Sequence, residues 1–248
     1  MVGRVESYLL ERIKKKGATH LILIDPDKAS PQAASQISVE AESAGTGGVM
    51  VGGSTATSTR QLDEVVRAIK KAVKIPVILF PSNITGLSQY ADAIWFMSLL
   101  NSTNVYFLIG AQALSASVVK RYGIEPIPMG YIILGEGGAA GYIGQAHPVP
   151  YEHPEIAAMY ASAAQFLGMR FVYLEAGSGA KEHVPPSLVS LVRKNVEIPI
   201  IVGGGIRSAE IARKMVEAGA NIIVTGTLVE EVSLLRKAIG EIVGAVEG

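Results

Sequence analysis

Eight short runs of apolar residues, most of them rich in β-branched side chains, alternate along the chain with segments that have the spacing of amphipathic helices. The runs are continuous in hydrophobicity, which is typical of strands that are buried on both faces of a parallel sheet. They cover residues 20–25, 48–54, 75–82, 92–99, 127–135, 170–177, 198–205 and 221–227. Strands of this kind that are joined by helices predict an α/β fold.

The length of the chain and the lack of a linker decide between one barrel and two smaller domains. The chain has 248 residues, and a closed (β/α)8 TIM barrel typically needs about 250. No linker-like segment divides it, so we expect a single TIM-barrel domain over residues 1–248. One connection departs from the ideal barrel, because only the seven residues 85–91 separate FPSNI from the fourth run. The third helix is therefore expected to be short or missing.

Composition excludes several classes of protein. The chain has no cysteine, so it has no disulfide framework and no thiolate chemistry. Lys+Arg and Asp+Glu both number 22, and a net charge of zero argues against a general affinity for nucleic acid or anionic membranes. No segment reaches the roughly 20 apolar residues of a membrane span, and the charged N-terminus does not resemble a signal peptide. We therefore expect a cytoplasmic protein without a transmembrane segment.

The clearest functional signal is the pair of glycine-rich segments that end the seventh and eighth runs, IIVGGGIRSAE and IIVTGTLVEE. Glycine lets backbone N–H groups approach an anion closely, and the N-terminus of the following helix adds a favourable dipole. TIM barrels commonly bind phosphate at these two loops. The pair predicts a phosphate site, although the same glycines also suit tight turns. Arg207 either adds charge there or is a solvated residue near a helix start.

Two acidic residues follow the first run, in the segment LIDPDK. Asp25 ends the strand and is expected to point into the mouth of the barrel, where a carboxylate can hold Mg²⁺ together with substrate phosphates. Asp27 is better explained as the cap of a turn with Pro26. Ser54, in VGGST at the end of the second run, offers a neighbouring oxygen, but it also suits an anion-binding turn or a helix cap.

The sixth run ends in YLEAGSGA, which places Tyr173 and Glu175 two residues apart, so that their side chains share one face of a strand. A phenol and a carboxylate in the mouth suit hydrogen bonding to substrate hydroxyls, and Glu175 is placed to take a proton from one of them. A buried glutamate without a role would be costly. The histidines lack the spacing of a zinc site, since His147 and His153 lie six residues apart in a loop.

Two further features allow alternatives. The Gly/Pro-rich segment 135–154 follows the fifth run on the side where barrel active sites lie, and it is either a mobile lid or an ordinary long connection. Five aromatic residues either line an apolar groove or belong to the core, which is the commoner place for single aromatics on strands. They are Trp95, Phe96, Tyr106, Phe107 and Tyr131.

In this order, LIDPDK, VGGST, YLEAGSGA, VGGGIRS and TGT resemble the geranylgeranylglyceryl phosphate synthases of archaea. The resemblance runs from about Gly17 to the C-terminus and includes the shortened third connection. It implies a Mg²⁺-dependent prenyltransferase of lipid biosynthesis. The 3-hydroxyl of sn-glycerol 1-phosphate would attack C1 of geranylgeranyl diphosphate, releasing diphosphate and forming the first ether bond of archaeal membrane lipids. YLEAGSG suggests the larger of the family's two groups, whose members tend to be higher homo-oligomers.

The resemblance also implies roles for single residues. Asp25 and Ser54 would bind Mg²⁺ with the diphosphate, and Glu175 would receive the proton of the glycerol hydroxyl or orient that hydroxyl. The prenyl chain would lie in an apolar groove that the missing third helix opens along the barrel's flank, near Trp95 and Leu99. The glycerol and then its phosphate would be held by Tyr173, Leu174, Glu175, Ala176, Gly177, Ser178 and Gly179, and by Gly204, Gly205, Gly226 and Thr227.

Three alternatives compete with this interpretation. A bacterial enzyme of the heptaprenylglyceryl phosphate synthase type, with a longer prenyl donor, would have a similar sequence pattern. A non-catalytic barrel that binds phosphometabolites would keep the glycine-rich loops, but phosphate binding alone requires neither Asp25 nor Glu175. Barrels that act on sugar phosphates usually carry a catalytic lysine or aspartate pair at strand ends, whereas Lys28 follows Asp27 outside the strand.

Overall fold

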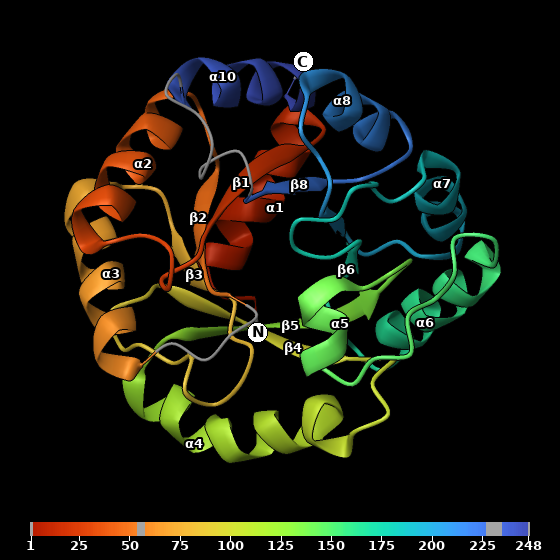
Figure 1. Cartoon of the computed structure of the whole chain (residues 1–248), viewed down its shortest axis with the longest axis horizontal. Helices are drawn as coiled ribbons and strands as arrows, with labels where there is room; N and C mark the ends of the chain where they lie inside the picture. Colours follow the sequence, from red (N-terminus) through yellow and green to blue (C-terminus); the bar gives the residue numbers. More distant parts are fainter. Residues whose placement is uncertain (1, 54–57, 227–234, 248) are drawn as a thin grey trace.

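The computed structural model describes residues 2–53, 58–226 and 235–247 and shows a closed barrel of eight parallel strands in sequence order (Figure 1). Each strand pairs with the next, and β8 pairs with β1 in the register Leu21 to Val224. The predicted TIM barrel is therefore confirmed. The strands are β1 (Thr19–Ile24), β2 (Gly48–Val51), β3 (Val77–Leu79), β4 (Ala93–Leu99), β5 (Glu125–Ile133), β6 (Phe171–Glu175), β7 (Ile200–Gly203) and β8 (Ile222–Thr225).

Helices form a ring outside the strands in Figure 1. Three of them begin at serine caps, Ser30, Ser58 and Ser208, whose side chains accept the N–H three residues further on. A short π-helix, η1 (Tyr106–Gly110), leads directly into α4. The α-helices are α1 (Arg4–Lys16), α2 (Pro31–Ser43), α3 (Thr59–Ala72), α4 (Ala111–Tyr122), α5 (Gly138–Ile143), α6 (Pro154–Phe166), α7 (Pro186–Asn195), α8 (Ala209–Glu217) and α10 (Leu235–Val246).

The two faces of the barrel wall bury different sets of apolar side chains, because successive residues of a strand point to opposite sides. Inside the barrel, Leu21, Met50, Trp95, Phe171 and Ile201 belong to one buried cluster. Their sequence neighbours on the strands pack outward against the surrounding helices in two further clusters. Both faces are therefore dry, which accounts for the continuous apolar runs in the sequence and for the mean hydropathy of +0.34.

Helix α1 closes the end of the barrel at which the strands begin. Its Val5 and Leu9 are buried with the interior cluster. The carboxylate of Glu125, at the start of β5, accepts the N–H groups of Val5 and Glu6 at 2.7 and 2.9 Å. With this end covered, access to the interior is left at the opposite end, where the strands finish.

The link between β3 and β4 contains no helix. All residues from 80 to 92 are described, and they form only turns, bends and extended backbone. The predicted loss of the third helix is thus confirmed, because β3 and β4 are joined by residues 80–92 without a helix. Residues 96–98 of β4, which such a helix would help to cover, are only partly buried.

The long connection 135–154 contains structure that was not predicted. It includes α5, and backbone bridges join Leu134 to Val149 and Ser102 to Ala146. The sequence GEGGAAG has a low intrinsic tendency to form a helix, so contacts with the barrel rather than propensity hold this turn. A Cβ at Gly137, for example, would lie 2.7 Å from the Ile133 side chain. Whether the connection moves as a lid stays a prediction.

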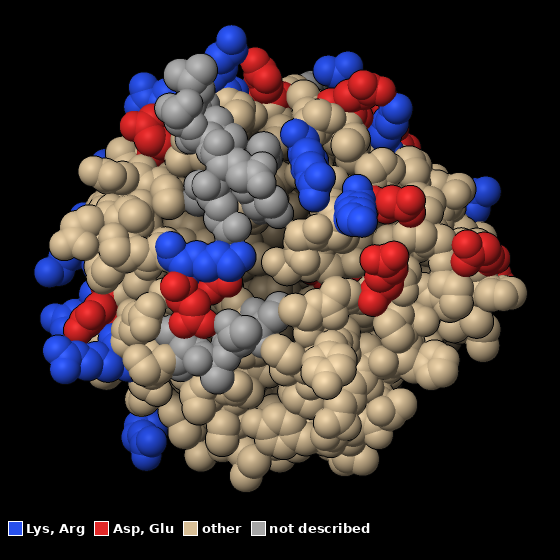
Figure 2. Space-filling model, in the orientation of Figure 1, with Lys and Arg blue, Asp and Glu red and all other residues tan. Residues whose placement is uncertain are grey.

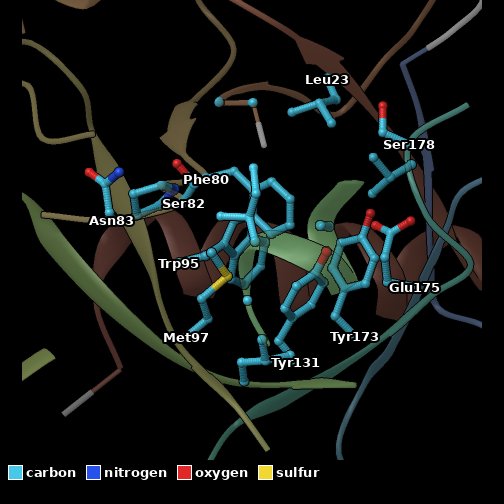
Figure 3. A pocket seen from close by; sticks show the side chains of 18 of the residues that line it. Leu23, Phe80, Ser82, Asn83, Trp95, Met97, Tyr131, Tyr173, Glu175 and Ser178 are labelled. Carbon is cyan, nitrogen blue, oxygen red and sulfur yellow. The ribbon is translucent and has the colours of Figure 1, made fainter. Parts of the chain in front are cut away.

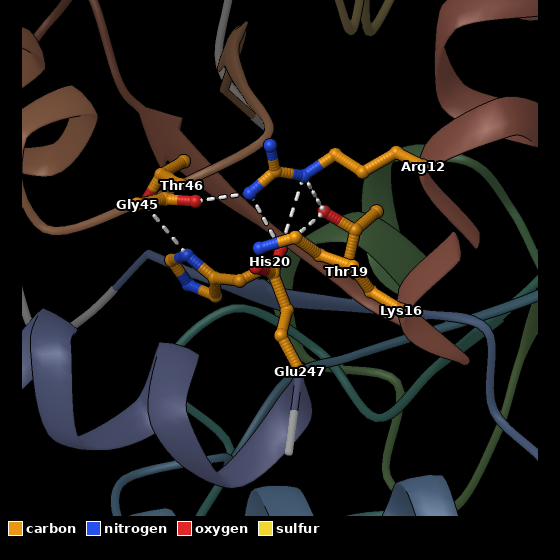
Figure 4. A network of polar contacts seen from close by, with 7 residues as sticks. All are labelled: Arg12, Lys16, Thr19, His20, Gly45, Thr46 and Glu247. Atoms are coloured by element: carbon orange, nitrogen blue, oxygen red, sulfur yellow. Dashed lines mark hydrogen bonds and ion pairs between the residues drawn. The ribbon is translucent and has the colours of Figure 1, made fainter. Parts of the chain in front are cut away.

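A buried ionic network joins the C-terminus to the closed end of the barrel (Figure 4). The guanidinium of Arg12 donates to Glu247 Oε1 at 2.6 and 3.0 Å, to Thr19 Oγ1 at 2.8 Å and to the carbonyl of Gly45. Lys16 Nζ lies 2.7 Å from Glu247 Oε2. The Glu247 side chain is only 5% exposed. One carboxylate therefore connects α1, β1 and the end of α10.

We expect Glu247→Gln to destabilise the fold by about 2–3 kcal/mol, because it leaves the partly buried Arg12 guanidinium without its anion. Urea unfolding at pH 7 measures this loss. The matched control is Glu11→Gln on α1, the helix that carries Arg12. Glu11 lies 3.8 Å from Lys15, and the two side chains are 70% and 76% exposed. That control should cost less than about 0.5 kcal/mol, and equal losses in the two variants would contradict the role given to Glu247.

Candidate active site

A pocket opens at the end of the barrel where the strands finish, and it receives residues from β1, β2, β3, β6, β7 and β8 or from the loops that follow them (Figure 3). Among the described residues that line it, the charged ones are Asp25 and Glu175, and none is Lys, Arg or His. Figure 2 views the same end of the molecule. In that view, Lys, Arg, Asp and Glu surround the upper part, while the surface over η1 and α5 carries almost none.

Glu175, the last residue of β6, is 5% exposed and faces the pocket. Its Oε1 accepts the N–H of Gly177 at 2.6 Å. Burial raises the pKa of this carboxyl above its usual value, while hydrogen bonds from Gly177, Tyr173 and Tyr131 lower it in part. Burial and the nearby Glu175 charge in turn raise the pKa of both phenols. Glu175 is therefore a more basic carboxylate than an exposed one, surrounded by hydrogen-bond donors, and it suits proton transfer from a hydroxyl.

The predicted pairing of Tyr173 with Glu175 on one face is confirmed, and it explains the glycines at the end of β7. A Cβ at Gly203 would lie 2.0 Å from Tyr173 Oη, and one at Gly204 would lie 2.6 Å from Glu175 Oε1. Gly204 also has a φ of +83°. Only glycine satisfies both the close approach and this backbone conformation.

A similar approach joins β1 to β2. Asp25 lines the pocket, as predicted, and its Oδ1 accepts the N–H of Asp27 at 3.0 Å. Asp25 therefore also shapes the turn that follows β1. A Cβ at Gly53 would lie 2.6 Å from Asp25 Oδ1, so the VGG of β2 makes room for this carboxylate. A carboxylate at the mouth of a pocket is a suitable ligand for a hard divalent cation.

The glycine-rich loops after β6, β7 and β8 line the pocket together, through Ser178, Gly179, Gly204, Gly205 and Gly226. Backbone of this kind offers N–H groups to an anion. Arg207 is exposed, and its guanidinium donates to the carbonyl of Ala180 at 3.0 Å. It ties the loop after β7 to the loop after β6.

The remaining predicted site residues do not all face the pocket. Leu174 and Ala176 are buried in the core outside the barrel wall, because alternate residues of β6 face away from the pocket. Gly177 acts through its N–H bond to Glu175. Ser54 and Thr227 lie outside the described residues.

One aromatic residue of the site, Phe80, was missed as a functional candidate, whereas Tyr131, for which the sequence left a groove or a core position open, lines the pocket. The ring of Phe80 stacks on Tyr173, with centroids 5.4 Å apart and planes at 19°. It meets Tyr131 at 5.5 Å and 89°, and Tyr131 meets Tyr173 at 5.3 Å and 80°. Tyr131 lies directly opposite Tyr173 in the β5–β6 register. Tyr131 therefore shares the inward face of the barrel wall with Tyr173.

An apolar arm of the pocket extends from these rings past Trp95 and Met97 (Figure 3), and residues of α4 also line it. It runs past the strand that the missing third helix leaves uncovered. Ser98 Oγ donates to the carbonyl of Leu108 at 2.6 Å and so holds η1 against β4. The groove expected along the flank is present, and Trp95 both lines it and is fully buried. Its lining includes Leu87, Trp95, Phe96, Met97, Leu99, Phe107, Ala111 and Ile143.

The fold and this pocket define a class: a TIM barrel with a phosphate-type glycine cradle, one basic carboxylate and an apolar groove in continuous connection. Comparison with known proteins identifies the family. Residues 11–246 match the PcrB family, and the chain belongs to this family. The resemblance found in the sequence motifs is therefore confirmed.

Relatives within the family are similar over almost their whole length. The geranylgeranylglyceryl phosphate synthase of Thermofilum pendens is 53% identical over 245 residues, which cover 99% of this chain and 96% of that protein. The enzyme of the same name from Thermococcus gammatolerans is 56% identical over 237 residues, covering 96% of this chain and 94% of the relative.

A solved structure has the same architecture. The (S)-3-O-geranylgeranylglyceryl phosphate synthase of Thermoplasma acidophilum, in complex with substrate sn-glycerol-1-phosphate, superposes with a TM-score of 0.94 at 41% identity, covering 100% of this chain and 99% of that one. The thiamine phosphate pyrophosphorylase of Pyrococcus furiosus, at 14% identity and a TM-score of 0.62, shares only the fold.

The described helices include none that is long and apolar enough to cross a membrane. In the same part of the chain, no three His, Cys, Asp or Glu residues gather in the manner of a protein-only metal site. A cation at Asp25 would therefore depend on substrate oxygens for most of its ligands, which is common for Mg²⁺.

The raised pKa of Glu175 makes a prediction about stability. Since the folded protein holds the Glu175 proton more tightly than the unfolded chain, the contribution of this group is present below the unfolded pKa and is lost as pH rises through the folded one. Glu175→Gln has no such titration. We expect the variant to melt higher than the parent at pH 7.5, by roughly 2–4 °C, with the difference shrinking toward pH 4.

The control for this measurement is Glu210→Gln, because Lys214 lowers the pKa of the exposed Glu210 carboxyl. The sign is reversed for Glu210, whose contribution is present above the unfolded pKa and is lost as pH falls. A melting temperature of Glu175→Gln that falls below the parent's at pH 7.5 would show that the charged carboxylate stabilises the site.

Proposed function

We propose that this chain joins the 3-hydroxyl of sn-glycerol 1-phosphate to C1 of geranylgeranyl diphosphate, the reaction that forms the first ether bond of archaeal membrane lipids. The observation that carries the proposal is the continuity of the pocket, in which a glycine cradle and Glu175 open directly into a long apolar groove. A polar phosphate ester and a prenyl chain would each find matching surroundings there. The names of the similar proteins agree with this assignment.

In the proposed reaction, the allylic bond between C1 and the diphosphate oxygen breaks, and the electron pair leaves with diphosphate. The glycerol 3-oxygen forms the new bond to C1, and its proton passes to Glu175. Hydrogen bonds from Tyr173 and Gly177 hold the Glu175 carboxylate in place for this transfer. The backbone of the loops at Gly204, Gly205 and Gly226 would hold the glycerol phosphate, so that positioning supplies much of the rate.

Mg²⁺ dependence is part of the proposal. Asp25 suits the ion because its carboxylate reaches the pocket from the end of β1. The sequence also assigns Ser54 to the ion, and that residue lies outside the described part of the chain. When bound, Mg²⁺ would neutralise charge that develops on the departing diphosphate.

We also propose that the protein works as a homo-oligomer. The support is a largely exposed apolar surface on and after α6, formed by Met159, Phe166 and Leu167. Apolar patches of this kind commonly mark contacts between chains.

The direct test incubates purified protein with Mg²⁺, sn-glycerol 1-phosphate and labelled prenyl diphosphates of several lengths, with EDTA in a parallel reaction. We expect an ether product with the geranylgeranyl donor and its loss in EDTA. Glu175→Gln should reduce turnover by about 10²-fold or more, with little change in prenyl diphosphate affinity. A product only with longer donors would favour the bacterial type of enzyme, and no product with any donor would leave a phosphometabolite-binding barrel.

The groove makes a separate prediction about chain length. Ala111 lines the arm at the start of α4, so Ala111→Phe should lower kcat/KM for geranylgeranyl diphosphate relative to farnesyl diphosphate by about tenfold or more through steric exclusion. The control is Leu114→Phe on the same helix, where the parent side chain is 62% exposed and does not line the pocket. An unchanged ratio in Ala111→Phe would count against this route for the prenyl chain.

A further inference from the structure

Phe80 occupies a position that links the two ends of the proposed reaction. It follows β3 directly and lines the pocket with only 9% of its surface exposed. On one side its backbone abuts the end of β2, since a Cβ at Gly52 would lie 1.9 Å from the Phe80 carbonyl oxygen. On the other side its ring stacks on Tyr173. Phe80 thus spans the space from the Asp25–Gly53 contact to the Tyr173–Glu175 pair.

The reacting carbon must lie in the same interval if the proposed function is correct. The leaving diphosphate would be on the Asp25 side, and the attacking hydroxyl would be beside Glu175. C1 lies between these two oxygens during transfer and gains positive charge as the allylic bond breaks. The described lining of the pocket contains no cationic side chain that would oppose this charge.

The ring of Phe80 is held rigidly enough to present a fixed surface. Tyr173 covers it in a stacked arrangement, and Tyr131 contacts it at nearly a right angle. Figure 3 shows the three rings side by side at the junction of the polar pocket and the apolar groove. The face of an aromatic ring is negative, and it attracts a cation most strongly where water is excluded.

We propose that Phe80 is a catalytic residue whose π face stabilises the positive charge at C1 of the prenyl donor. The C1–O bond breaks with its electron pair going to diphosphate, the ring carries no bond to C1, and the glycerol oxygen then supplies the pair for the new bond. The proton of the hydroxyl goes to Glu175. The ring therefore lowers the barrier without being consumed or changed.

Fluorination of this one ring tests the proposal, because fluorine withdraws electrons from the π face while changing the ring's shape very little. We would replace Phe80 by 4-fluoro-, 3,5-difluoro- and 3,4,5-trifluorophenylalanine and measure single-turnover rates at saturating substrates. The logarithm of the rate should fall in steps with the number of fluorines, reaching a total loss of about 30-fold, the size expected of a desolvated cation–π contact.

Phe171 provides the matched control. It is also a buried aromatic ring inside the barrel, in contact with Trp95 at 5.2 Å, but it does not line the pocket. The same fluorinated series at Phe171 should leave the rate unchanged. Melting temperatures and the Kd of geranylgeranyl diphosphate, measured for every variant, separate the electronic effect from loss of packing or binding.

The possible outcomes distinguish this proposal from the function on which it rests. If the parent protein forms no ether product, the proposed function fails first. If the parent is active and the single-turnover rate is the same for every fluorinated Phe80 variant, Phe80 only packs against Tyr173 and the catalytic role is overturned. Phe80→Leu adds a second measurement, since a folded variant that retains the full single-turnover rate would overturn the role equally.

Discussion

The site depends on the close approach of Tyr173 and Glu175 to the glycine backbone at the end of β7. A carboxylate with 5% exposure is costly to bury, and its N–H bond to Gly177 at 2.6 Å offsets part of that cost. The approach is possible only because Gly203 and Gly204 have no Cβ. The YLEAG and VGGG segments are therefore two halves of one packing arrangement. The same glycines that admit the carboxylate also leave backbone free to face an anion.

The missing helix between β3 and β4 is connected to the shape of the pocket. In an ideal barrel a helix follows every strand, and a helix after β3 would fill space beside β4 and α4. Here the link from Leu79 to Ala93 has no helix, and the pocket continues between β4 and α4. The resulting exposed apolar surface inside the groove has a stability cost that a ligand with a long hydrocarbon chain would remove. In this way a missing element of the fold provides the space that the proposed substrate requires.

The fold and half of the site could be predicted because both follow from local patterns. Continuous apolar runs mark buried parallel strands, and polar or glycine residues at their ends mark the mouth, which located Asp25 and Glu175. Phe80 was not predicted as a site residue because only closure of the barrel brings it to Tyr173, and no local sequence pattern indicates that the two rings lie close together. Leu174 and Ala176 were included with their motif, although the period of two in a strand turns them outward. Helix α5 was not predicted because its sequence has almost no helix propensity.

The pocket favours negative charge at its glycine loops and positive charge at its centre. At the glycine loops, backbone N–H groups favour an anion, and the described residues that line the pocket include no lysine or arginine, which fits a chain whose net charge is zero. At the centre, two carboxylates and three aromatic rings favour positive charge. A site that held only phosphates would gain nothing from acidic and aromatic groups at its centre. The separation is instead suited to a reaction that keeps one phosphate bound while a neighbouring carbon becomes briefly cationic.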